Sequence, residues 1–146
     1  MKSQKGFTLI ELIVVLTILA ILAVFAIPRF ITVTADARVA AINGLKGSVL
    51  SATSLAKAKY KAVGNTSATT VDMDGTSVTV TSGTGANAGV PVGTSAGITS
   101  ALQSTDGFTA TYAAGVATFN FTTAVTNCNL TYTDPAGTVA TTTTGC

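Results

Sequence analysis

Histidine and tryptophan are absent from this 146-residue sequence, and charged residues make up only 10% of it. The acidic residues are few and scattered along the chain: Glu11, Asp36, Asp72, Asp74, Asp106 and Asp134. Without histidine, and without a serine or cysteine in a nucleophile setting such as G-x-S-x-G, the sequence has few of the groups that catalysis uses. We therefore expect a protein that is not an enzyme, with no catalytic residues, no metal site and no cofactor.

Basic residues are also too sparse to make a nucleic-acid surface. The formal net charge is only +2, and no block of basic residues is interleaved with aromatic ones. Lys57, Lys59 and Lys61 form the only basic cluster in the sequence, and its plain interpretation is the solvated end of a helix. We expect no specific nucleic-acid partner.

Cysteine occurs only twice, at Cys128 and Cys146. With no histidine to complete a zinc-binding set, this pair fits a disulfide better than a metal site. A disulfide would place this part of the chain in an oxidising compartment. Two free buried thiols are the alternative.

A long apolar run lies near the N-terminus. Residues 7–27, about 21 in all, would form a helix roughly 30 Å long, which matches the hydrocarbon thickness of a bilayer. Because Lys2 and Lys5 precede the run, the positive-inside rule puts the N-terminus in the cytoplasm and the rest of the chain outside. We predict a single membrane-spanning segment with a cytoplasmic N-terminus.

One acid, Glu11, interrupts this run close to its start, and an acid at the centre of such a helix costs on the order of 3 kcal/mol. Glu11 either reaches water at the membrane surface or has a functional partner inside the apolar environment. The run also resembles a secretory signal with a cleavage site at Val24-Phe25-Ala26. It is longer than an ordinary signal h-region and carries an acid, so we do not expect cleavage there.

After Pro28 the chain becomes amphipathic. Apolar residues recur every three or four positions, which predicts a helix with one buried face; they are Ile31, Ala35, Val39, Ile42, Leu45, Val49, Ala52, Ala56, Tyr60 and Val63. Arg38 and the lysines fall off this stripe. Gly64-Asn65 predicts the C-terminal stop. Since the helical pattern resumes directly after Pro28, we expect a kink there and not an end.

The remaining residues, 65–146, are rich in Thr, Ser, Gly and Ala and predict strands. Residues 70–81 predict a hairpin around Asp74-Gly75, residues 108–112 and 116–121 a second hairpin, and residues 129–133 a further strand before the turn at 134–137. Residues 82–97 are interpreted as a flexible connection and residues 98–102 as one helical turn. The predicted fold class is α+β: a long kinked N-terminal helix whose C-terminal half packs on an antiparallel sheet of three or four strands.

The N-terminal residues resemble a known family. The stretch Gly6-Phe7-Thr8-Leu9-Ile10-Glu11, after a short basic leader and before about twenty apolar residues, resembles the class III leader of type IV pilins and pseudopilins. Residues 28–47 further resemble the mannose-sensitive haemagglutinin type of pilin (type IVa). Ala20 stands where many relatives have glycine, so any unwinding of the helix between Ala20 and Pro28 is less secure here.

The resemblance implies specific roles for these residues. It implies cleavage between Gly6 and Phe7 by a prepilin peptidase, N-methylation of Phe7, a role in assembly for Glu11, and a helix bend at Pro28. The implied organisation is a leader (1–6), a membrane-spanning and filament-core helix (7–27), an amphipathic helix (28–64) and a globular head with a C-terminal disulfide loop (65–146). In the filament, the amine of Phe7 would meet Glu11 of a neighbour and set the register.

The function that follows is structural. We expect a subunit, a major pilin, that polymerises with copies of itself into an extracellular type IV pilus for attachment or motility. Its partners would be the prepilin peptidase, the pilus assembly machinery, minor pilins and the inner membrane before assembly. The alternatives are a pseudopilin of a type II secretion system and a membrane-anchored binding module that never polymerises.

Overall fold

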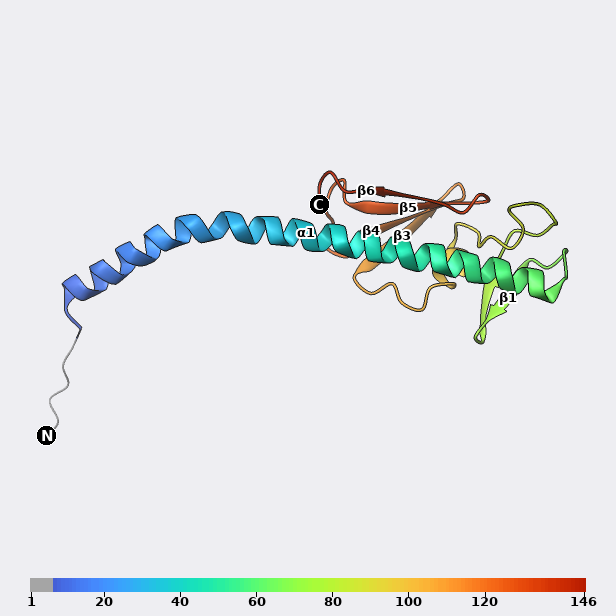
Figure 1. Cartoon of the computed structure of the whole chain (residues 1–146), viewed down its shortest axis with the longest axis horizontal. Helices are drawn as coiled ribbons and strands as arrows, with labels where there is room; N and C mark the ends of the chain where they lie inside the picture. The colour runs from blue at the N-terminus through green and yellow to red at the C-terminus, as the bar shows by residue number, and fades with distance from the viewer. Residues whose placement is uncertain (1–6) are drawn as a thin grey trace, which may run out of the picture. The chain divides into compact units, whose positions relative to one another are not determined.

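The structure, a computed structural model, describes residues 7–146, without the side chains of residues 26–33. The chain begins with one 55-residue helix, α1 (Leu9–Val63), and continues into strands (Figure 1). It divides into two compact units, Met1–Ala37 and Arg38–Cys146, and α1 contributes to both.

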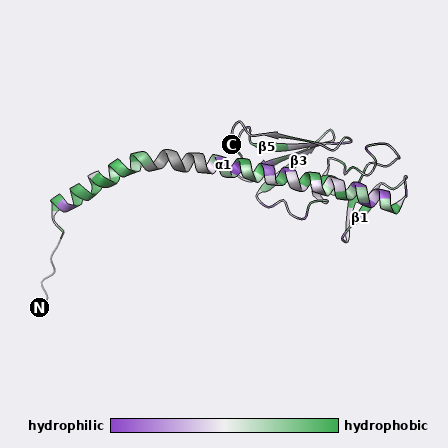
Figure 2. Ribbon diagram, in the orientation of Figure 1, coloured by the Kyte–Doolittle hydropathy of each residue, from purple (hydrophilic) through white to green (hydrophobic). Residues whose placement is uncertain are grey.

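In the first unit, residues 9–25 of α1 are apolar except for Glu11 and Thr17. Every side chain from Phe7 to Phe25 is exposed, and Figure 2 shows this part of the ribbon as almost continuously hydrophobic. Over the residues that the structure describes, no helix has the combined length and hydropathy that crossing a membrane requires. The helix α1 continues through Pro28. The bend predicted at Pro28 falls among residues 26–33, whose side chains are not described, and the leader, residues 1–6, lies outside the described residues.

In the second unit, α1 carries the predicted apolar stripe. Its buried members are Ile42, Leu45, Val49, Ala52, Ala56 and Tyr60. Val63, predicted to belong to the stripe, is the last residue of the helix and is 58% exposed. The helix stops where predicted: Gly64 has φ = 69°, a left-handed conformation that glycine adopts without steric cost.

The strands form two antiparallel sheets. A two-stranded sheet pairs β1 (Thr70–Met73) with β2 (Thr76–Thr79), and a four-stranded sheet has the order β3 (Phe108–Ala113), β4 (Val116–Phe121), β5 (Asn129–Thr133) and β6 (Thr138–Thr142). Both predicted hairpins and the strand at 129–133 are confirmed. The sequence did not predict β6, nor that the first hairpin forms a separate sheet.

The stripe of α1 covers both sheets in turn. Leu45 and Val49 pack in a core cluster with residues of the four-stranded sheet, including Phe119, Leu130 and Tyr132. Further along the helix, residues Ala56 and Tyr60 pack with Val71, Val78, Val80 and Ala88 around the two-stranded sheet. Neither sheet could bury its apolar face without the helix. The predicted α+β class, a long helix packed on small antiparallel sheets, is therefore confirmed.

Within the connection at residues 82–97, predicted to be flexible, residues 88–93 are packed, whereas residues 82–87 are mostly exposed. Val90 is fully buried, and Pro91 forms a bridge with Val80. Gly89, at φ = 79°, lies where an added Cβ would collide with the side chain of Tyr60. The short helix η1 is at Ser95–Thr99, earlier than the predicted turn at 98–102, and contacts β2 and β3. Small residues such as Gly89 let this segment lie close to α1. Because these buried residues do not recur at a regular spacing, the sequence pattern did not predict their burial.

Candidate functional site

The N-terminal end of α1 is closed by Thr8 and Glu11. Thr8 directly precedes the first helical residue, Leu9, and its carbonyl accepts the first helical bond, from the Leu12 N–H at 3.3 Å. The Thr8 hydroxyl accepts a hydrogen bond from the Glu11 N–H at 3.3 Å, and Glu11 Oε2 accepts one from the Thr8 N–H at 2.8 Å. The two residues therefore form a reciprocal N-cap.

A third bond strengthens this cap. The Thr8 hydroxyl also donates to Glu11 Oε2, at 2.8 Å. A helix leaves its first N–H groups without intrahelical acceptors and has a positive N-terminal dipole, so a carboxylate in the first turn is favourable there. One local reason for an acid in the apolar run is thus the cap. The sequence analysis missed Thr8, although the signal T-x-x-E before an apolar run was present.

The surroundings of this cap are apolar. Glu11 lies beside a shallow hollow of about 290 Å³ whose other walls are Phe7, Ile10, Val14 and Val15. Phe7 itself is 84% exposed. In the next turns of the helix, the Thr17 hydroxyl donates back to the Val14 carbonyl at 2.8 Å, which satisfies the hydroxyl within the helix. Glu11 is the one ionisable side chain between residues 7 and 25.

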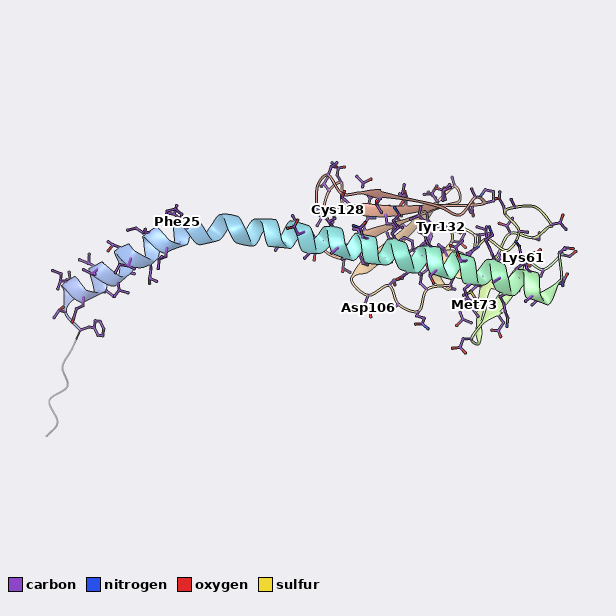
Figure 3. All side chains as sticks on the ribbon, viewed as in Figure 1. Phe25, Lys61, Met73, Asp106, Cys128 and Tyr132 are labelled. Carbon is purple, nitrogen blue, oxygen red and sulfur yellow. A yellow bond between two sulfur atoms is a disulfide. The ribbon has the colours of Figure 1, made fainter. Side chains whose placement is uncertain are left out.

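The two cysteines belong to the other unit. Cys128 and Cys146 are joined by a disulfide with an S–S distance of 2.01 Å, and Cys128 is fully buried. Figure 3 marks Cys128 near the end of the chain. Arg38 of α1 donates from Nη1 to the carbonyl oxygen of Cys146 at 3.1 Å, so the helix also holds this loop. The sequence analysis placed Arg38 off the apolar stripe but gave it no partner.

The other predicted site residues are not placed. Gly6, on one side of the predicted cleavage site, lies outside the described residues, and the side chain of Pro28 is not described. Within the part of the chain that is described, no group of three or more His, Cys, Asp or Glu residues is arranged to hold a metal ion.

The N-terminal residues of the chain match a known sequence motif. Residues 1–27 match the family model of the prokaryotic N-terminal methylation motif. This match supports a class III prepilin leader of the type IV pilin kind at the N-terminus. The motif indicates a type IV pilin-like or pseudopilin precursor. No curated protein and no solved structure matches the chain significantly.

The prepilin leader implies processing by a prepilin peptidase and assembly into a pilus-like complex. The Thr8–Glu11 cap lies inside the matched residues.

Proposed function

We propose that this chain is the structural subunit of an extracellular type IV pilus, a major pilin that polymerises with copies of itself. The observation that carries the proposal is the prepilin leader followed directly by a helix segment, residues 9–25, whose side chains are all exposed. An apolar helix surface of this size is not stable in water and needs an apolar environment on every side. A bilayer before assembly and a bundle of identical helices afterwards both provide one.

Processing would prepare the chain for this change of environment. In our proposal, the precursor sits in the inner membrane with Lys2 and Lys5 on the cytoplasmic side, and prepilin peptidase cuts between Gly6 and Phe7. The cut creates an α-amino group on Phe7, which is largely protonated at neutral pH and keeps its charge when N-methylated. The mature helix then starts with a cation at Phe7 and an anion at Glu11.

These two charges would set the register of assembly. In a staggered bundle, the amine of one subunit can meet Glu11 of its neighbour, whereas a wrong register leaves a charge unpaired among apolar side chains. Losing one partner of a buried ion pair costs about 3–5 kcal/mol. The pair therefore selects one stagger over the others more than it adds net stability.

A pseudopilin of a type II secretion system is the second candidate, because the matched motif is common to both kinds of subunit. The C-terminal disulfide between Cys128 and Cys146 favours the pilin. A membrane-anchored binding module would have the same leader but would remain monomeric in the membrane.

The test is to shear filaments from cells that express the chain, image them and determine the subunit mass. We expect filaments whose subunit begins at Phe7 and carries one additional methyl group on its amine. N-terminal peptide sequencing locates that methyl group. A mature chain beginning at Ile27, or a processed chain found only as a membrane monomer, would contradict the proposal.

A further inference from the structure

In the cap at the start of α1, only one carboxylate oxygen of Glu11, Oε2, accepts hydrogen bonds from Thr8. Both donors of Thr8, the N–H and the hydroxyl, bind Oε2 at 2.8 Å. An ionised carboxylate has about four lone-pair sites, two on each oxygen. Among residues 7–146, which the structure describes, the two bonds occupy Oε2 and leave Oε1 for a donor from elsewhere.

The cap also fixes where Glu11 points. A glutamate side chain has several freely rotating bonds, and holding it in one conformation costs conformational entropy. Two hydrogen bonds to the preceding turn hold the carboxylate beside the helix end before any neighbour arrives. A partner that meets a side chain already held in place loses less entropy on binding.

We propose that Thr8 is a positioning residue for filament assembly: it holds Oε2 of Glu11, so that Oε1 faces the Phe7 amine of an incoming subunit. This inference rests on the proposed function and assigns a role to a residue that the sequence analysis did not single out. Thr8 does not itself contact the incoming amine.

Processing leaves this arrangement intact. All the groups that make the cap belong to Thr8 and Glu11, and both residues follow the cleavage site at Gly6. Removal of the leader changes the nitrogen of Phe7 but no donor or acceptor of the cap. The positioned carboxylate is therefore available in the precursor and in the mature subunit.

A purely structural cap is the rival explanation, and substitutions at Thr8 separate the two. Serine keeps both the cap and the hydroxyl donor. Glycine caps a helix almost as well as threonine but has no hydroxyl. Valine has the shape of threonine, caps poorly and has no hydroxyl. A structural role predicts that Thr8→Gly behaves like wild type, whereas a positioning role predicts that it behaves like Thr8→Val.

The experiment co-expresses each variant with the wild-type chain. Mass spectrometry gives the ratio of variant to wild type in sheared filaments, divided by the same ratio for processed subunit in the membrane, so insertion and cleavage cancel. We expect wild-type incorporation for Thr8→Ser and about tenfold lower incorporation for Thr8→Gly and Thr8→Val, because a hydrogen bond to a charged group is lost. Thr17→Val is the matched control, because the Thr17 hydroxyl binds only a carbonyl of its own helix.

A double variant shows whether Thr8 acts through Glu11. If it does, Thr8→Gly adds no further loss to Glu11→Gln, since the carboxylate it positions is gone. Normal incorporation of Thr8→Gly, or multiplying effects in the double variant, would overturn the inference. Wild-type incorporation of Glu11→Gln would instead overturn the register role in the proposed function, and the inference with it.

Discussion

The two described parts of α1 differ in what covers their apolar side chains. From Leu9 to Phe25 every side chain is exposed; Phe25, labelled in Figure 3, is 72% exposed. From Ile42 to Tyr60 the buried apolar side chains form one stripe, which packs against the chain's own sheets. A single continuous helix thus contains one part whose apolar side chains the fold buries and another part whose apolar side chains stay exposed.

The difference follows from the pattern of residues and not from their hydrophobicity alone. A helix with one apolar stripe needs a partner on one side, and the β-sheets of the same chain provide it. A helix that is apolar all round needs partners on every side, which a chain of this length does not supply. The first part must therefore find its cover outside the molecule, which is the physical basis for proposing a filament.

The most direct test of this difference is to separate the striped part of α1 from the exposed part. Removing residues 1–34 leaves the striped part of α1 with both sheets and retains the whole compact unit Arg38–Cys146. We expect a soluble, folded monomer that has lost all membrane association and all assembly. Size-exclusion chromatography and circular dichroism would check this, and aggregation of the oxidised fragment would show that the striped part also needs outside cover.

The next largest effect is expected at Glu11, the charged residue of the exposed part. Glu11→Gln and Glu11→Val should be inserted and cleaved normally, but filaments should fall on the order of 100-fold, because each assembled subunit would have an unpaired amine. Immunoblots of processed subunit in the membrane beside sheared filaments measure the two steps separately. Normal piliation by Glu11→Val would remove the register role.

Much of the second unit could be predicted because local signals and packing agree there. Gly64 ends the helix in the left-handed conformation, and Asp74 and Gly75 both have positive φ, as the predicted hairpin turn requires. The alternation of β4 and β5 matches their burial, with Ala117, Phe119, Leu130 and Tyr132 inside.

The missed features depend on contacts that the sequence does not display. Strand β6 is mostly threonine, and only its pairing with β5 identifies it as a strand. The buried segment around Val90 is packed because Tyr60 and the first hairpin leave a space that fits small residues. The N-cap formed by Thr8 and Glu11 could have been predicted, because the sequence T-x-x-E before an apolar run is its signature.

A matched pair of leucines on α1 tests how far the buried stripe extends. Leu45 is 7% exposed in the core, whereas Leu55 is 60% exposed and lines a surface hollow. In the fragment 35–146, Leu45→Ala should lower the free energy of unfolding by about 2–5 kcal/mol, and Leu55→Ala by about 0.5 kcal/mol or less. Urea unfolding of both variants measures this, and equal losses would contradict the one-sided burial of the helix.

The disulfide tests whether the second unit needs a covalent constraint besides the helix. The bond closes a loop with a sequence separation of 18, worth roughly 3 kcal/mol in the chain-entropy model. We expect Cys128→Ser and Cys146→Ser to lose about that much stability in the fragment and to lower subunit abundance in cells. Alkylation with mass spectrometry checks the oxidation state, and free thiols in native filaments would contradict the pairing.

The smallest expected effect concerns Tyr132, which is fully buried beneath α1 and donates from its hydroxyl to the Pro91 carbonyl at 2.6 Å. Burial raises the pKa of Tyr132 to about 12; a hydrogen bond with Thr53 opposes this rise, and the charge of Asp134 adds to it. Tyrosine in an unfolded chain has a pKa of about 10. The folded state therefore holds the proton more tightly, and its contribution to stability is complete below pH 10 and is lost as the pH rises through about 12.

The raised pKa of Tyr132 gives a prediction for the pH-dependent stability of Tyr132→Phe in the fragment 35–146. At pH 7 the variant should be less stable by about 1–2 kcal/mol, because the Pro91 carbonyl loses its donor. Between pH 10 and 12 the difference from wild type should shrink, because Tyr132 ionises in the unfolded wild type but keeps its proton in the folded state, which favours unfolding. Phenylalanine has no proton to lose, so the variant does not change in this range. Urea unfolding at a series of pH values measures the difference. A gap that stays constant up to pH 12 would mean that the hydroxyl reaches water as the fold opens locally, and that α1 covers this sheet less completely than its buried stripe indicates.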